Sequence, residues 1–445
     1  MPPCKDRAAK RATTLRKMTS SLSEDDLAKA SSVMAERTSS MSSRASSKSP
    51  LTDDELTDVL RSLHNITPSD AGIDWDALQS LLAKVAHLSH KDWNVTGTNS
   101  DEMARVLLPS GRGSLMSSDQ MFERILHEGN WDGALKHTTE SGEDGEKWAV
   151  LVTGVNGIRK TTAMYQPWFS NVLQEALIAP TLAKEKKKDF KLEVLPNGHN
   201  SFFRQLDHMI TTLCNEDFSK LYALTSAQLD DTAKNDIDSP NKKKRALDAD
   251  PPKELIKRYS NLKAGIFSRY RTLSELLGVL LLKEAQDANI NAMCETSGRD
   301  IAMFHYIDHF FSDEYNKLAL HFSINDLSHA KASVDRRMVT EMRAGRDALA
   351  TGDVVEVIYA NAGGPYGSEV LEGVQADSDR VWKEVVMKEG GDDDDDDSDG
   401  VGKDWYKAEM KINAYDDKPW TIRAVRPDGT LGTEYTFGDP RIVGL

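Results

Sequence analysis

Between residues 51 and 137, apolar side chains recur every three to four positions, which is the period of amphipathic helices. Thr52 and Glu55 form a capping-box pair directly before the first of these repeats, and such pairs mark helix N-termini. We therefore predict a helical region over residues 51–140. Its predicted helices run from Thr52 to Leu63, from Trp75 to Leu88, and from a second cap-like pair, Ser117 and Gln120, through Leu126.

Beyond residue 140 the pattern changes to short apolar runs separated by helical stretches. Strands that alternate with helices are typical of parallel sheets, and ligands in such folds bind where the strands end. Each run here ends in polar residues. We predict an α/β fold with a doubly wound, mainly parallel sheet over residues 141–370. The predicted strands are Ala149–Val152, Phe190–Leu195, Ile290–Cys294, Leu318–Ile324 and Val354–Tyr359.

The segments between these strands carry their own signals. Pro167 predicts that the helix after the first strand ends early or kinks, because proline lacks the N–H that a helix needs. Residues 225–252 are rich in lysine and contain prolines, so we predict an exposed, disordered insertion. A long apolar helix is predicted over Leu255–Asp287. A later helix carries four arginines, at positions 336, 337, 343 and 346.

The last part of the chain, residues 371–445, is predicted to be a small β-rich region. Asp392–Asp399 is almost wholly aspartate, which is typical of a solvated linker. Trp405–Ile412 and Trp420–Val425 alternate apolar and polar residues as half-buried strands do, and a Pro-Asp-Gly turn signal follows. We expect a small β meander that packs on the main domain.

Composition narrows the functional classes. The net charge of −15 argues against a general nucleic-acid binder, since phosphate backbones attract basic surfaces. No apolar run approaches the ~20 residues of a membrane span. The three cysteines lack metal-ligand spacing and favour a reducing compartment, so we expect a cytoplasmic protein. Residues 1–50 are rich in Ser, Lys and Arg, a composition shared by disordered tails and by plastid or mitochondrial transit peptides; both interpretations stay open.

A candidate phosphate-binding loop follows the first strand. It matches the Walker A pattern at Gly154, Lys160 and Thr161 and departs from it at Arg159, which stands in place of the last glycine. Glycines let consecutive backbone N–H groups face one anion. The residues predicted to bind the nucleotide are Gly154, Val155, Asn156, Gly157, Ile158, Arg159, Lys160, Thr161 and Thr162.

Three kinds of side chain complete a phosphoryl-transfer site. Lys160 would neutralise phosphate oxygens, and the Thr161 hydroxyl would bind Mg²⁺. Glu295, at the end of an apolar strand, would organise Mg²⁺ or the nucleophile; the alternative is a carboxylate that pairs with the nearby Arg299. The arginine-rich helix offers cations that would close over a transferring phosphoryl group, although arginines on an exposed helix face are the alternative.

The loop, the segment Glu295-Thr296-Ser297-Gly298-Arg299 and the arginine-bearing helix resemble the zeta-toxin-like P-loop kinases over residues 145–367. The resemblance implies an ATP- and Mg²⁺-dependent kinase that phosphorylates a hydroxyl of a small molecule or nucleotide sugar. It also implies that Arg336 or Arg337 covers the transferred phosphoryl group.

The resemblance is incomplete at the general base. In the family a catalytic aspartate follows the second strand, two residues before a Phe-Arg pair. Here Ser201 occupies that place before Phe203 and Arg204, and Asp207, about one helical turn further on, is the substitute candidate.

Two other functions stay open. The loop and the ETSGR segment are also similar to signal-recognition-particle GTPases, but the guanine-reading Thr-Lys-x-Asp element is absent after the strand that begins at Leu318. A nucleotide-binding scaffold without catalysis is the third interpretation, with protein partners bound through the helical and β appendages. For the kinase interpretation we expect a nucleotide and a small-molecule acceptor as ligands.

Overall fold

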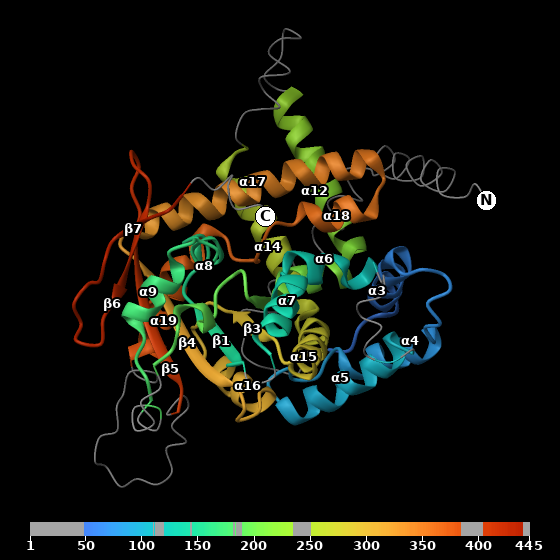
Figure 1. Cartoon of the computed structure of the whole chain (residues 1–445). Helices are drawn as coiled ribbons and strands as arrows, with labels where there is room; N and C mark the ends of the chain where they lie inside the picture. The colour runs from blue at the N-terminus through green and yellow to red at the C-terminus, as the bar shows by residue number, and fades with distance from the viewer. Residues whose placement is uncertain are drawn as a thin grey trace. The chain divides into compact units, whose positions relative to one another are not determined.

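The computed structural model describes residues 49–109, 111, 120–142, 145–180, 183, 189–234, 251–383 and 404–438. Within them the chain forms an α/β structure with a seven-stranded, mostly parallel sheet of order β2-β3-β1-β4-β5-β6-β7 (Figure 1). This confirms the predicted α/β class and the mainly parallel sheet. The strands are β1 (Trp148–Thr153), β2 (Ser201–Arg204), β3 (Asn291–Glu295), β4 (Asn316–Ile324), β5 (Tyr406–Asn413), β6 (Thr421–Val425) and β7 (Tyr435–Thr436).

Backbone contacts divide the chain into two units. Of the described residues, those within 125–205, 278–333 and 368–438 form the sheet unit, and those within 49–124, 206–277 and 334–367 form the helical unit. The sheet unit contains α7 (Trp131–Ser141), α8 (Lys160–Met164), α9 (Phe169–Ala176), α16 (Ala302–Phe310) and α19 (Leu371–Val381). The helical unit contains α3 (Asp53–Ile66), α4 (Trp75–Val85), α5 (Trp93–Leu107), α11 (Leu206–Leu213), α12 (Asn215–Lys234), α14 (Lys253–Arg269) and α18 (Val354–Ala360). Residues of α6 (Gln120–Glu128), α15 (Arg271–Asp287) and α17 (Leu327–Thr351) belong to both.

The central strand is β1, and all six of its residues are buried. It pairs in parallel with β3 on one side and with β4 on the other, so that Val152 lies opposite Glu295 and Thr153 lies opposite His321. The sequence of a strand that is covered on both faces is a continuous run of apolar residues. This is why the sequence pattern located β1, β3 and β4.

The order of the strands creates a switch point beside β1. The connection from β1 leads through α8 and α9 to β2, on the β3 side of the sheet, whereas the connection from β4 leads to β5 on the opposite side. In open α/β sheets, ligands bind in the crevice where neighbouring strand ends send their connections in opposite directions. The residues that follow β1 and β4 lie at this place.

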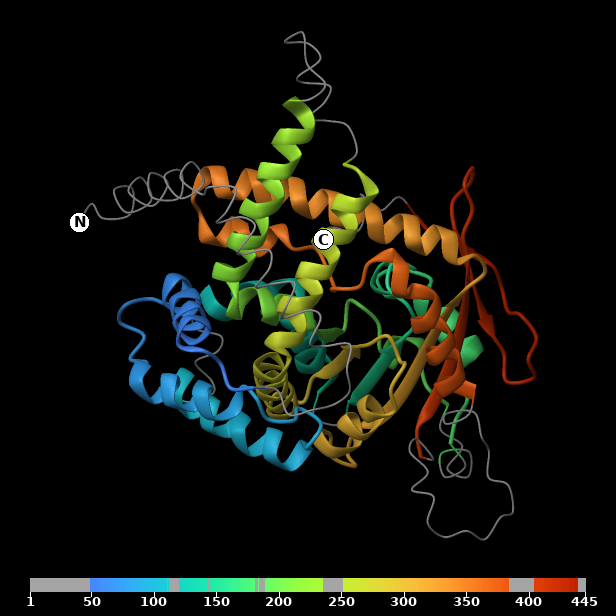
Figure 2. The same ribbon diagram turned by 180° about the vertical axis from the view of Figure 1, so that it is seen from behind.

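The C-terminal strands extend the main sheet. β5 pairs in parallel with β4, from Leu318 opposite Tyr406 to Ile324 opposite Ile412, and β6 and β7 continue antiparallel to the edge of the sheet (Figure 2). α9 packs against β5 and β6. The two strands and their antiparallel succession were predicted, but the meander continues the main sheet through the pairing of β5 with β4 instead of packing on the domain as a small β element of its own. The outer edge of β4 offers a row of backbone donors and acceptors, and β5 satisfies them.

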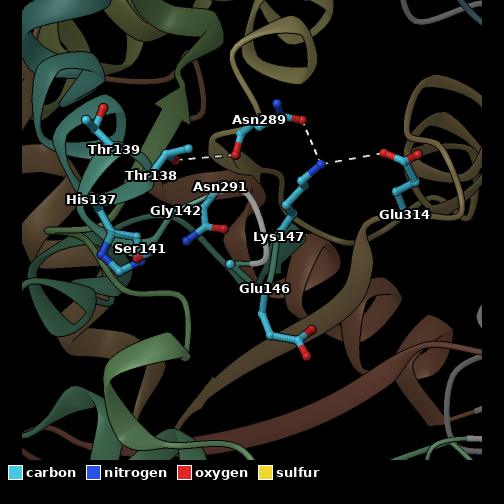
Figure 3. Close-up of a pocket in the computed structure, with 11 residues that line it drawn as sticks. His137, Thr138, Thr139, Ser141, Gly142, Glu146, Lys147, Asn289, Asn291 and Glu314 are labelled. Atoms are coloured by element: carbon cyan, nitrogen blue, oxygen red, sulfur yellow. Dashed lines mark hydrogen bonds and ion pairs between the residues drawn. The ribbon is translucent and has the colours of Figure 1, made fainter.

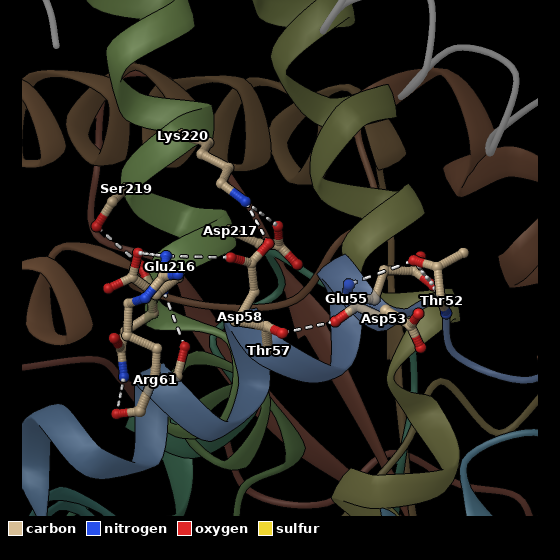
Figure 4. A network of polar contacts seen from close by, with 12 residues as sticks. Thr52, Asp53, Glu55, Thr57, Asp58, Arg61, Glu216, Asp217, Ser219 and Lys220 are labelled. Atoms are coloured by element: carbon tan, nitrogen blue, oxygen red, sulfur yellow. Dashed lines mark hydrogen bonds and ion pairs between the residues drawn. The ribbon is translucent and has the colours of Figure 1, made fainter. Parts of the chain in front are cut away.

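In the helical unit, α3 begins as predicted. The Thr52 hydroxyl accepts from the Glu55 N–H at 3.3 Å, and the Glu55 carboxylate accepts from the Thr52 N–H at 2.9 Å. Figure 4 shows the polar network that joins α3 to α12: Arg61 lies 3.5 Å from Glu216, and Lys220 pairs with Asp58. Charged side chains therefore contribute to the contact between these two helices.

Two predicted strands are wrong. Val354–Tyr359 lies in α18, because the Asp353 side chain caps the Val355 N–H at 2.9 Å and the buried positions recur with helical spacing. Phe190–Leu195 is largely exposed and contains the short 3₁₀ helix η2 (Leu192–Val194), and another 3₁₀ turn, η3, covers Ser368–Val370. β2 starts only at Ser201, after a Pro-Asn-Gly turn.

Other boundaries differ from the prediction. The helix predicted over Leu255–Asp287 is two helices, α14 and α15, that meet at Tyr270. Helix α12 continues to Lys234, inside the segment that we predicted to be a disordered insertion. Residues 235–250, the cap residue Ser117, the tail 1–48 and the aspartate run 392–399 lie outside the described residues. The helix that begins at Gln120 and the helix Trp75–Val85 are confirmed.

Candidate functional site

The loop after β1 adopts a conformation that only glycine takes freely. The backbone φ angles of Gly154 and Gly157 are 124° and 85°. A Cβ atom on Gly154 would lie 2.4 Å from the Phe322 carbonyl oxygen of β4, so this position has no room for a side chain. Among the described residues, the N–H groups of residues 155–157 donate no hydrogen bond to the protein. Such a run of unsatisfied donors is what an anion-binding nest requires.

Lys160 is folded back onto this loop. Its side chain is almost completely buried, and its ammonium donates to the carbonyl oxygens of Gly154 at 2.8 Å and Val155 at 2.9 Å. The same ammonium lies 3.0 Å from the Glu295 carboxylate. A buried cation persists only when it is paired and hydrogen-bonded, and these three oxygens supply both.

Glu295 links the end of β3 to the loop. One carboxylate oxygen pairs with Lys160, and the other accepts a hydrogen bond from the Thr161 hydroxyl at 3.1 Å. The adjacent pairing of β1 with β3 explains this proximity, since Glu295 lies opposite Val152. The structure therefore brings together Lys160, Thr161 and Glu295, three residues that the sequence singled out.

The helix after the loop is short. α8 has five residues, Lys160–Met164, and Pro167 precedes the next helix, so the predicted early end is confirmed. Five residues form little more than one turn. The electropositive groups of the loop are therefore its N–H groups and the cations Arg159 and Lys160, rather than the dipole of a long helix.

A chain of polar contacts next to the loop, from Thr153 through His321 to Asp379, was not indicated by the sequence. The Thr153 hydroxyl lies 2.9 Å from Nδ1 of the buried His321, whose Nε2 lies 3.5 Å from Asp379 of α19. The His321 ring also stacks on Trp382 at 4.9 Å. These contacts fix Thr153, the residue before Gly154. The one available signal was a histidine interrupting the apolar run of β4.

Ser201 does not occupy the place that the resemblance gave it. It is the first residue of β2 and lies opposite Asn291, the first residue of β3. That is the amino edge of a parallel sheet, whereas Gly154 follows the carboxyl end. The residues that follow β2 are instead Gln205, Leu206 and Asp207, so Asp207 lies three residues beyond the strand end.

The remaining candidates belong to the helical unit. Asp207 is half-buried on α11, Arg336 is exposed on α17, and Arg337 donates to the Gly364 carbonyl oxygen at 3.2 Å. Arg337 also lies 3.8 Å from Glu341, one turn along α17. Its guanidinium therefore holds the loop after α18 in place.

A buried ion pair, missed by the sequence analysis, lies next to Arg337. Lys263 of α14 and Glu341 of α17 are completely buried, and the ammonium lies 2.6 Å from the carboxylate. Glu341 also accepts from the Tyr259 hydroxyl at 3.1 Å and from the Ala362 N–H at 3.1 Å. The available signal was a lysine on the apolar side of α14, four residues after Tyr259.

This pair gives a testable pH dependence. Burial lowers the pKa of Lys263 to about 8, while the charge of Glu341 opposes the shift. The unfolded lysine keeps its proton to about pH 10.4, so unfolding takes up a proton between pH 8 and 10, and stability rises with pH in this window. We expect the stability of the wild type, relative to a Lys263→Met/Glu341→Gln variant, to increase by on the order of 1 kcal/mol from pH 7.5 to 9.5. Urea unfolding at both pH values measures this; equal changes in both proteins would contradict it.

A pocket of about 560 Å³ lies at the amino edge of the sheet, at the opposite end of β1 from the loop (Figure 3). Lys147 crosses it, 2.7 Å from the Asn289 side-chain oxygen and 3.5 Å from Glu314. Its charges are mixed and already paired. None of the residues that the sequence singled out lines it.

No protein-family profile, curated protein or solved structure matches the chain. Among the described residues, no helix is both long and apolar enough to cross a membrane.

Proposed function

We propose that the loop 154–162 binds the phosphates of ATP and that the protein is a Mg²⁺-dependent kinase of the P-loop type. The observation that carries the proposal is the arrangement of Lys160. Its buried ammonium, held by two loop carbonyls and Glu295, lies beside N–H groups that have no acceptor within the described parts of the chain. A phosphate would accept from those donors, and Lys160 would donate to it in exchange for one of its three present oxygen partners.

The position of the loop in the sheet supports the same proposal. It follows the central strand at the switch point, where α/β sheets bind ligands. Thr153 and Gly154 are packed against β4, so the start of the loop is rigid. A rigid loop costs little ordering entropy when a phosphate binds.

The residues here fit Mg²⁺. The Thr161 hydroxyl and the Glu295 carboxylate are hard oxygen ligands within 3.1 Å of each other. Within the described ranges, no group of three or more His, Cys, Asp or Glu could hold a metal ion alone. Mg²⁺ ordinarily takes one or two protein oxygens and completes its shell with phosphates and water, and it would supply charge neutralisation at the phosphates.

The chain offers Asp207 as general base for an acceptor hydroxyl. It follows β2, the sheet strand beyond β3, by three residues. Lys160 would then orient the phosphates, and Asp207 would accept the proton of the attacking hydroxyl.

A GTPase is the second candidate, favoured by the ETSGR segment after β3. The strand end after β4 opposes it: the Asn325 side chain accepts from the Ala414 N–H at 2.8 Å and joins β4 to β5. Asp326 accepts from the Ser328 N–H at 2.8 Å and starts α17. Both side chains thus already have partners within the fold, which favours the kinase over the GTPase.

We expect the wild type to bind Mg²⁺-ATP in preference to Mg²⁺-GTP, and Lys160→Ala to lose at least 100-fold in affinity. A cation about 4 Å from a phosphate charge contributes about 4 kcal/mol at an effective dielectric near 20. Isothermal titration calorimetry measures the affinity, and phosphate release with candidate hydroxyl acceptors measures turnover.

Lys147→Ala is the matched control, because this lysine precedes the opposite end of β1 and is also paired with a carboxylate. It should keep the wild-type ATP affinity within about twofold, as mutations at distant sites act independently. The absence of affinity for both nucleotides would exclude kinase and GTPase alike. ATP binding without turnover would favour a non-catalytic scaffold.

A further inference from the structure

Arg159 adopts a strained backbone conformation. Its φ angle is 65°, in the left-handed region that glycine occupies freely and other residues rarely enter. It stands where the Walker pattern has glycine, directly before Lys160. Strain of this kind persists only where surrounding contacts hold it in place. The contacts of the Arg159 side chain can therefore explain why this position does not need a glycine.

The guanidinium of Arg159 stacks on Trp420, with its central carbon 4.3 Å from the ring centroid. This is within the range of a cation–π interaction. Trp420 precedes β6 and is itself fixed: its indole N–H donates to the Tyr415 carbonyl oxygen at 3.2 Å, and the His329 ring packs edge-on at 5.9 Å. Only 8% of the tryptophan surface is exposed.

The topology explains how this contact arises. β6 is antiparallel to β5 with Thr421 opposite Asn413, so Trp420 lies at the carboxyl edge of the parallel strands, the edge from which the phosphate loop projects. The residues between β5 and β6 thus reach the loop after β1. More than 250 residues separate the two partners in the sequence.

We propose that Arg159 and Trp420 form a latch that sets the phosphate loop in its binding conformation, so that nucleotide affinity depends on the C-terminal strands. This inference rests on the proposed function. Arg159 is a positioning residue: the stack fixes its left-handed backbone, and that backbone determines where the N–H groups before it and the ammonium after it point. The latch takes over the role of the missing glycine.

The variant Arg159→Gly tests whether position 159 needs only a positive φ or needs the contact of Arg159 with Trp420. If position 159 only needs a positive φ, glycine removes the strain and completes the Walker pattern, and ATP affinity stays the same or increases. If the latch positions the loop, glycine makes the loop flexible and ATP affinity falls by about tenfold, although the variant folds normally. We expect the tenfold loss, measured by titration calorimetry, with thermal unfolding as a check on folding. Unchanged or tighter binding would overturn the latch.

Two further variants test the stack itself. Trp420→Phe keeps an aromatic face and should retain most of the affinity, whereas Trp420→Leu keeps apolar volume without that face and should lose about as much as Arg159→Gly. Combining Trp420→Leu with Arg159→Gly should add little, because residues that act through one contact are not additive. A full additional loss in the double variant would contradict the latch. If the wild type binds no ATP, the proposed function itself fails; if it binds ATP and all these variants bind equally, the latch alone fails.

Discussion

Replacing Lys263 by methionine should lower the free energy of unfolding by about 3–5 kcal/mol. The substitution leaves the carboxylate of Glu341 buried without its nearest cation, and removing one partner of a buried ion pair has costs of this size. The Tyr259 hydroxyl and the Ala362 N–H still donate to the carboxylate, but neither carries a charge, and the cation that remains, Arg337, lies farther away at 3.8 Å. Urea unfolding followed by circular dichroism measures the change.

The double variant Lys263→Met/Glu341→Gln should recover most of this loss. Glutamine keeps an acceptor for the Ala362 N–H and removes the buried charge that has lost its nearest cation, and buried ion pairs are often replaceable by neutral groups with little cost. Lys84→Met is the matched control in the same unit, because its 3.4 Å pair with Glu102 is exposed and should contribute less than 1 kcal/mol. A double variant that is as unstable as Lys263→Met would show that the lysine stabilises by packing rather than by charge.

Gly154→Ala should destabilise the sheet unit by about 3 kcal/mol or more. Two costs combine: a non-glycine residue at φ 124° costs about 1–3 kcal/mol, and the new Cβ would lie 2.4 Å from the Phe322 carbonyl oxygen, a backbone atom that cannot move without shifting β4. The variant should also lose ATP binding, because the loop would leave the strand end in a different direction. Thermal unfolding and ATP titration measure the two effects.

Gly429→Ala is the control that separates the cost of backbone strain at a positive φ from the cost of the steric clash at position 154. Its φ is 80°, also in the left-handed region, but a Cβ there meets no atom within 4 Å. It should therefore cost only the conformational strain, about 1 kcal/mol. Equal destabilisation by the two substitutions would show that packing against β4 is not what keeps position 154 a glycine.

The sequence predicted correctly those helices and strands that are determined by residues close together in the chain. β1, β3 and β4 are buried on both faces and read as apolar runs, and α3 begins at a capping box whose two residues lie three positions apart. The same reasoning failed for α18, because a short run rich in valine fits a strand and a helix equally well. There, the Asp353 cap and packing within the helical unit decide in favour of a helix.

The remaining features, which are the site, the buried ion pair and the place of β5 in the sheet, depend on contacts between distant segments. Lys160, Thr161 and Glu295 could be grouped from the sequence because strand ends with known chemistry meet at one edge of a parallel sheet. Lys263 and Glu341 could not, since they lie 78 positions apart on two helices and either residue alone fits an exposed face. Likewise, nothing local shows that β5 joins the main sheet, because strand pairing depends on which edge is available.

The pairing of β5 with β4 has a consequence for biosynthesis. β4 has nine residues, and its outer edge is completed only by residues 406–413, near the end of the sequence. On the ribosome, the core strands 148–324 are therefore synthesised well before the strand that closes them. Until then β4 presents an open, apolar edge that can pair with another chain. A nascent or truncated chain that stops before residue 406 should be prone to aggregation and dependent on chaperones.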